Sequence, residues 1–297
     1  MKSCILTDTL ANLKSRPELS KRRITELHLT RYFTTVELDD GSVGACMSYY
    51  WLPDTMLAKV EGQIAKWIGD YPFAVCNQSA LGEAVAECIP DNAQRYFILT
   101  SVAASVASAL SSQSLRQGGD EVFEVVKNRP ADWVDGVKTA LVVGFGGYLE
   151  TLLAEKNIGK LHVVDLSYDR RRTDIDAKIA SYRERFPVKI ITVSPRLDGA
   201  TQLRDFDLIS ITGSTLSNGT LEGILAEARK DSKLILQGQS ASLHPKFLFQ
   251  AGIDWVATTI KTAAVSRMAR GDYSGRSLRP ILEGGLPWIY LVPRRGQ

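Results

Sequence analysis

Three segments in the second half of the chain combine glycine with groups that could hold a small polar molecule. The first is LVVGFGGYLETLL, in which Gly144, Gly146 and Gly147 follow an apolar run. Glycines in such a turn let the backbone approach a phosphate at the start of the next helix. Asp165 ends the following apolar run, where an acid would bind the ribose of a dinucleotide. Because Leu149 occupies the position of the third fingerprint glycine, the match is partial.

A second interpretation of this turn needs no ligand. Any strand-to-helix turn in a doubly wound sheet favours glycine, because the chain reverses closely against its own sheet. Asp165 could equally cap the segment that follows it. Both interpretations stay open for this segment.

The second segment, GSTLSNGTLEGIL, lies between an apolar run and a helix-forming sequence. Its glycine, hydroxyl and amide residues are Gly213, Ser214, Thr215, Ser217, Asn218, Gly219 and Thr220. Helix capping would explain Asn218 and Thr220. The remaining positions favour a loop whose hydroxyl and N–H groups bind a polar or anionic ligand.

The third segment, GQSASLHPKFLF, contains one of the three histidines of the chain. Its candidate residues are Gly238, Gln239, Ser240, Ser242 and His244. Pro245 is a standard first residue of a helix. His244 is a candidate ligand-binding, acid–base or metal-ligating residue, although a loop histidine is more often a hydrogen-bonded bystander. Lys261 could add a positive charge here, but a solvent-facing side chain is the favoured expectation.

These segments can act together only if the strands before them share one sheet. Six short apolar runs, separated by helix-compatible segments, are TALVVGF, KLHVVDL, VKIITVS, FDLISITG, KLILQG and DWVATTI. This alternation predicts a parallel sheet covered on both faces. Loops at the carboxyl ends of parallel strands surround the ligand crevice. The three segments are therefore expected on a single rim of the sheet.

The first half of the chain has a different pattern. The stretch FTTVELDDGSVGACMSY predicts a hairpin that turns at the Asp-Gly pair, Asp40 and Gly41. Helical periodicity follows, which suggests an α+β domain. The uncharged run 96–115 carries eight Ser, Thr or Gln side chains, so a buried helix is favoured over a membrane span. The polar segment KNRPADW places the domain boundary near Pro130, with domains 1–130 and 131–297.

Composition narrows the class of partner. Hydrophobic residues make up 44% and charged residues 23%, and the net charge of +3 is spread along the chain, which disfavours nucleic acid. The short apolar run at the start lacks the core of a signal peptide, so the sequence indicates a cytoplasmic protein without a membrane partner. The four cysteines show no CxxC spacing and are expected to be reduced. GxxxxGK[ST], HExxH and GxSxG are absent, so no motif supports a kinase or hydrolase.

The combination of VGFGGYL, GSTLSNGT, GQSASLHPKFLFQAGIDWVA and SVAASVASAL resembles the family described as "putative heavy-metal chelation", long a domain of unknown function. The resemblance covers nearly the whole chain. It implies a domain similar to the amino-terminal domain of enolases, then a Rossmann-like domain, with a site in the cleft between them and a heavy-metal ion or chelate as cofactor. Where the family pattern usually has Asn, this chain has Ser108, which puts a polar role there in doubt.

The leading hypothesis is a two-domain protein that binds, and in one version processes, a small polar or anionic ligand such as a metal chelate or chelator precursor in this cleft. The alternative is an enzyme with NAD(P) or S-adenosylmethionine at the glycine turn and Asp165 on its ribose. A third hypothesis is a direct metal carrier with His244 and either Asp165 or a cysteine as ligands, although the spacing of the histidines and cysteines shows no preassembled cage. An interaction protein without a small-molecule site ranks last. Catalysis and the oligomeric state, homo-oligomers included, stay open.

Overall fold

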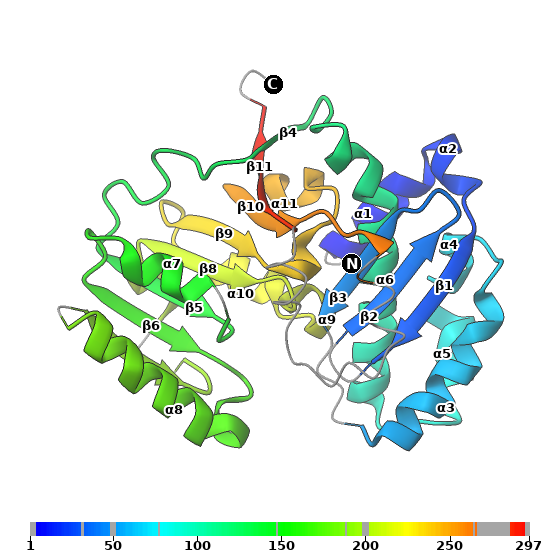
Figure 1. The fold of residues 1–297 in the computed structure, drawn as a ribbon, viewed down its shortest axis with the longest axis horizontal. Coiled ribbons are helices and arrows are strands. Elements are labelled where there is room, and N and C mark those ends of the chain that lie inside the picture. Colours follow the sequence, from blue (N-terminus) through cyan, green and yellow to red (C-terminus); the bar gives the residue numbers. More distant parts are fainter. Residues whose placement is uncertain are drawn as a thin grey trace.

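The computed structural model of the chain describes residues 4–30, 33–47, 52–76, 78–146, 148–187, 189–197, 202–263, 265 and 286–294. Its elements form two lobes that lie side by side, with helix α6 near their junction (Figure 1). The elements up to this junction are α1 (Ile5–Lys14), α2 (Pro17–Ser20), β1 (Ile24–Leu29), β2 (Phe33–Leu38), β3 (Val43–Met47), α3 (Asp54–Ile64), η1 (Ala65–Trp67), α4 (Pro72–Val75), α5 (Gln78–Ala86) and α6 (Asn92–Arg116).

The second part of the chain alternates strands with mostly short helices. Its elements are β4 (Phe123–Val126), β5 (Thr139–Val143), α7 (Tyr148–Ala154), β6 (Lys160–Val164), α8 (Tyr168–Arg185), β7 (Ile190–Ser194), η2 (Leu203–Asp205), β8 (Leu208–Thr212), α9 (Thr215–Asn218), α10 (Leu221–Glu227), β9 (Lys233–Gln237), η3 (Gln239–Ala241), α11 (Lys246–Gln250), β10 (Trp255–Thr259) and β11 (Trp288–Pro293).

In the first lobe, β1, β2 and β3 form an antiparallel sheet in that order. The predicted hairpin is confirmed: β2 pairs with β3, and Phe33 lies opposite Met47. Gly41 has φ of 73°, a left-handed conformation that glycine adopts without strain in a tight turn. The pairing brings Met47, the last residue of β3, towards the second lobe.

Helix α6 packs directly on this sheet. The Asp91 side chain caps its start by accepting a hydrogen bond of 2.7 Å from the Gln94 N–H. A Cβ on Gly44 of β3 would lie 1.9 Å from the carbonyl oxygen of Ser105, so this close contact requires glycine. In length and composition α6 could span a membrane, but 83% of its most apolar window is buried within the protein. The prediction of a buried core helix is confirmed.

The second lobe contains all six predicted parallel strands. The large sheet has the order β4-β11-β10-β9-β8-β5-β6-β7, and each neighbouring pair from β10 to β7 is parallel. Numbered along the chain, these six strands follow the Rossmann order 3-2-1-4-5-6. The strand order therefore reverses between β5 and β8, where ligands of open α/β sheets bind. The α/β fold class is confirmed.

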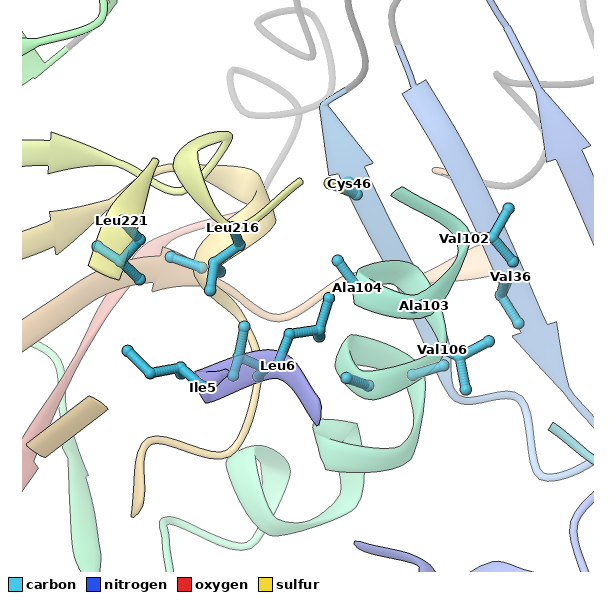
Figure 2. Close-up of a cluster of buried hydrophobic side chains, with 14 of the residues drawn as sticks. Ile5, Leu6, Val36, Cys46, Val102, Ala103, Ala104, Val106, Leu216 and Leu221 are labelled. Carbon is cyan, nitrogen blue, oxygen red and sulfur yellow. The ribbon is translucent and has the colours of Figure 1, made fainter. Parts of the chain in front are cut away.

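Alternation along the strands gives each face of this sheet its own core. In β5, Leu141 belongs to the cluster that also contains α6, whereas Val142 packs with α7 and α8 on the opposite face. The first cluster continues across the junction of the lobes. Figure 2 shows Leu216, Leu221 and Ile5 on one side of α6 and Val36 on the other. A continuous apolar core thus holds the two lobes together.

Two antiparallel strands extend the large sheet beyond the sequence prediction. β11 pairs with β10, and β4 pairs with β11. β4 precedes the predicted domain boundary near Pro130, yet it is the edge strand of the second lobe. The chain therefore enters the large sheet ahead of that boundary.

Candidate ligand site at the carboxyl edge of the large sheet

The loops after β5, β8 and β9 lie against one another at the reversal point of the sheet. A Cβ on Gly144 would lie 2.6 Å from Thr212 Cγ2, and one on Gly213 would lie 2.7 Å from the Ala241 nitrogen. Gly144 and Gly238 have φ of 90° and 112°, which also favour glycine. We call this meeting of loops, formed by residues 144–146, 212–215 and 238–242, the rim. Within it Gly146 is exposed, and Gly147 lies outside the described residues.

Most hydroxyl and amide groups of the second loop serve the loop itself. Thr215 Oγ1 donates to the Thr212 carbonyl at 2.7 Å, and Ser217 Oγ donates to the Ser214 carbonyl at 2.9 Å. Asn218 Oδ1 accepts from the Thr220 N–H at 3.1 Å and from its hydroxyl at 2.6 Å. Turn and capping bonds thus account for more of these side chains than the sequence argument allowed, and their contact with a ligand stays a prediction.

Gly219 has a packing role at the junction of the lobes. It ends α9 with φ of 70°, and a Cβ there would lie 3.1 Å from Tyr96 Oη of α6. The carbonyl of Ser217 also accepts a hydrogen bond from Thr100 Oγ1 of α6. These contacts fix the loop against the first lobe.

Asp165 acts as a cap. Its Oδ2 accepts from the Phe145 N–H at 2.7 Å, and its Oδ1 accepts from the Ser167 N–H at the same distance and from the Ser167 hydroxyl. The carboxylate is only 8% exposed. Both oxygens are thus used to hold the glycine turn and the start of α8. This geometry agrees with the capping interpretation and disfavours a ribose contact.

The loop after β9 joins the lobes through two serines. Ser240 Oγ accepts from the Met47 N–H at 2.7 Å, at the end of β3. The hydroxyls of Ser242 and Ser108 lie 2.6 Å apart. Ser108 is buried and has a polar role after all, in spite of the departure from the family pattern.

Lys261 is a buried lysine beneath the rim, which corrects the expectation of a solvent-facing side chain. It is 1% exposed, and its ammonium donates to the Gln239 carbonyl, to Ser242 Oγ and to the Thr259 carbonyl, the last at 3.1 Å. Burial lowers the pKa of Lys261 to about 7. Its position directly after an apolar strand was the available sequence signal, since the carboxyl ends of such strands reach the crevice.

Two rim loops also present backbone N–H groups that find no acceptor within the described part of the chain. The N–H groups of Ser214, Gln239 and Ser240 make no hydrogen bond with any residue that the structure describes, although these residues are 8%, 6% and 2% exposed. In the trans peptide between Gln239 and Ser240, the N–H of Ser240 points away from the Gln239 carbonyl, to which the Lys261 ammonium donates. Buried N–H groups nearly always have a partner. These donors suit an incoming carboxylate or phosphate oxygen.

His244 lies away from the rim. Its N–H donates to Ser111 Oγ at 2.8 Å, one helical turn beyond the contact between Ser108 and Ser242. The chain between Ser242 and His244 thus runs along α6 towards the end of that helix. His244 is 1% exposed and makes no hydrogen bond with the described residues of the glycine turn or of the loop after β8.

The surroundings of His244 do not suit a metal ligand. Its Nε2 lies 2.6 Å from Asp120 Oδ2, and its Nδ1 faces the Lys246 N–H at 3.4 Å. Nε2 therefore carries the proton and donates to Asp120, while Nδ1 accepts. Arg16 Nη2 lies 3.0 Å from the same Nε2 and 3.5 Å from Asp120 Oδ2. Burial lowers the pKa of His244, which keeps it neutral, but both ring nitrogens are occupied and a guanidinium lies beside them.

A metal cage is absent from the part of the chain that the structure describes. No group of three or more His, Cys, Asp or Glu side chains there is placed to hold a metal ion. The four cysteines are free thiols. Direct binding of a heavy-metal ion by the described residues alone is not supported by this donor set.

The comparisons confirm the resemblance to the chelation family. Residues 133–277 match the family DUF364, described as "Putative heavy-metal chelation". A crystal structure of a DUF364 protein of unknown function from Desulfitobacterium hafniense DCB-2 is 15% identical, with a TM-score of 0.62 over 97% of this chain and 98% of that one. A second DUF364 protein of unknown function, from Pyrococcus horikoshii, is 14% identical, with a TM-score of 0.55 over 98% and 100%. No curated protein matches the sequence. At these identities the likeness shows the fold.

Proposed function

Taking the DUF364 fold as the premise, we propose that this protein binds a small polar or anionic molecule at the rim, where the second lobe faces the end of β3. The class of ligand is an organic acid or an organic chelator, free or with its metal ion. The observation that carries the proposal is that Ser214, Gln239 and Ser240 are buried and that their N–H groups have no acceptor among the residues that the structure describes. They lie on neighbouring loops at the reversal point of the sheet.

The positive charge of Lys261 favours the binding of an anion at the rim. Its ammonium binds the Gln239 carbonyl, so the positive charge lies directly behind the donors of the third loop. An anion at the rim would stabilise the charged form of Lys261 and raise its pKa above the value of about 7 that burial imposes. Binding of the anion should then take up protons near neutral pH and weaken at alkaline pH.

The family description, heavy-metal chelation, is accounted for by the ligand and not by metal-ligating side chains of the protein. In this proposal the ligand supplies most of the metal coordination, and the protein recognises its carboxylate oxygens. This division agrees with a donor set that is rich in N–H groups and hydroxyls and holds no cage of metal-ligating side chains among the described residues. The nucleotide alternative has less support, because Asp165 uses both carboxylate oxygens within the protein.

Citrate, Ni(II)–citrate and Ni(II) alone are suitable probes. We expect citrate and Ni(II)–citrate to shift the backbone amide resonances of Ser214, Gln239 and Ser240 in nitrogen–proton correlation spectra, and Ni(II) alone to leave them in place. Binding should weaken above pH 7 and be reduced in Lys261→Met. If both citrate probes at millimolar concentration left these resonances unmoved, or moved only residues distant from the rim, the proposal would be wrong.

A further inference from the structure

A cavity of about 400 Å³ lies at the far end of α6 from the rim. Helix α1 and the residues after it line it with Asn12 and Arg16, and the last turns of α6 line it with Gln113 and Gln117. Lys246, the first residue of α11, contributes a further side. Its volume falls within the range of small-molecule pockets, roughly 300–1,000 Å³. This cavity shares no residue with the rim, so its use is separate from the function proposed above.

One wall of the cavity is held in a fixed arrangement. Asp120 lines the cavity, and its Oδ2 accepts from His244 at 2.6 Å while Oδ1 accepts from the Val122 N–H at 3.0 Å. Arg16 lies 3.5 Å from the same carboxylate. His244 itself packs edge to face on Phe123, with ring centroids 5.2 Å apart. The buried histidine thus fixes the carboxylate and, through it, the guanidinium that borders the cavity.

The uncharged polar lining keeps its hydrogen-bonding capacity. The side chains of Asn12, Gln113, Ser114 and Gln117 make no hydrogen bond with the residues that the structure describes. Three amides and a hydroxyl therefore offer both donors and acceptors to a guest. Such groups suit a guest that carries an amide or hydroxyl of its own.

The charged lining carries both signs. Arg16 and Lys246 are cationic, while Glu18, Asp120 and Glu121 are anionic. A simple anion would meet three carboxylates, and a simple cation would meet the guanidinium and the ammonium. A molecule with one charge of each sign can place each end near its opposite. We propose that this cavity binds a free α-amino acid with a polar side chain.

A matched set of three probes tests the charge requirement on the intact protein. L-glutamine carries both charges, N-acetyl-L-glutamine only the carboxylate, and L-glutaminamide only the ammonium at neutral pH. In calorimetric titration with parallel amide spectra, we expect L-glutamine to bind and to shift the resonances of Gln113 and Gln117. Each blocked analogue should bind at least about tenfold more weakly.

Two variants locate the site and leave His244, Asp120 and Arg16 unchanged. Lys246→Met and Gln113→Leu should each weaken the binding of L-glutamine about tenfold or more. Lys230→Met, an exposed lysine that does not line the cavity, is the control and should leave the affinity unchanged. The proposal is overturned if millimolar L-glutamine does not bind, if either blocked analogue binds as well, or if both cavity variants bind like the wild type. The amide resonances of the rim test the citrate proposal independently. Failure of L-glutamine to bind at the cavity can therefore be told apart from failure of citrate to bind at the rim.

Discussion

The hydroxyl groups of Ser108 and Ser242 lie 2.6 Å apart, one on the long helix of the first lobe and the other on the rim loop of the second. Ser242 Oγ also accepts from Lys261, so the three side chains form one buried chain across the junction of the lobes. The small size of both serines allows the helix and the loop to approach closely. This polar chain gives the rim a fixed position relative to the first lobe.

Loss of the Ser108 hydroxyl should weaken the junction. Ser108→Ala removes one partner of a buried hydrogen bond, and we expect the free energy of unfolding to fall by about 1 kcal/mol. Ser112→Ala is the matched control on the same helix, because its buried Oγ has no partner among the described residues. That variant should be neutral or slightly more stable. Urea unfolding measures both, and equal losses in the two variants would contradict this account.

Gly213 should tolerate no side chain. In Gly213→Ala the new Cβ would meet the backbone nitrogen of Ala241 at 2.7 Å, so two rim loops must separate. We expect a loss of about 1–3 kcal/mol in the free energy of unfolding, as for other overpacked sites. Gly223→Ala provides the comparison, since that helical position is open and alanine is the better helix former by about 1 kcal/mol. Thermal unfolding should lower the midpoint of the first variant and leave or raise that of the second.

Lys261 should make stability rise with pH on the alkaline side of neutrality. Its pKa is about 7 in the folded protein and 10.5 without burial, so between these values the unfolded chain binds the additional proton. The free energy of unfolding then increases with pH by up to about 1.4 kcal/mol per unit, while below pH 7 the penalty of the buried charge is fully present. Lys261→Met should flatten this rise between pH 7 and about pH 9 in urea unfolding. Parallel curves for the two proteins would argue against a lowered pKa of Lys261 in the folded protein.

His244 and His28 should affect acid stability in opposite directions. Burial lowers the pKa of His244, so the unfolded chain takes up a proton more readily and stability falls as pH drops below 6.5. The hydrogen bond with Glu61 raises the pKa of His28, whose contribution is fully present below pH 6.5 and is lost as pH rises through the raised pKa.

The matched variants His244→Gln and His28→Gln separate these two contributions. His244→Gln should reduce the acid loss of stability, whereas His28→Gln should deepen it. Unfolding free energies measured from neutral pH down to the range of carboxylate titration check both signs. A steeper acid loss in His244→Gln would show that this histidine is charged in the folded protein.

Much of the fold follows from local sequence pattern. The six apolar runs of the second half alternate with helix-compatible segments, and they became the parallel strands because period and length specify such strands without reference to distant residues. The Asp-Gly turn specified its hairpin in the same way. β4 and β11 were missed, because their pairing joins segments that are far apart in the chain. Their local sequence does not indicate which strand each of them pairs with.

For the candidate site, too, the sequence predicted some features and could not predict others. Sequence reasoning found the three loops, since the carboxyl ends of parallel strands must share an edge. It could not tell that the hydroxyls of Thr215 and Ser217 bond to their own loop, that Asp165 caps the turn, or that Lys261 is buried. It grouped His244 with the rim, although the chain after Ser242 carries this residue along α6 to Asp120 and Arg16.

The sequence by itself determined which segments form strands, helices and glycine turns, because backbone conformation depends mainly on neighbouring residues. Only the tertiary structure decided which polar groups have a hydrogen-bond partner within the protein and which have none among the described residues. That outcome depends on the approach of helix α6, the hairpin and the rim loops, whose contacts join residues more than a hundred positions apart, such as Ser108 with Ser242. Hydrogen-bond satisfaction is set by distance in space, and local pattern carries little information about it.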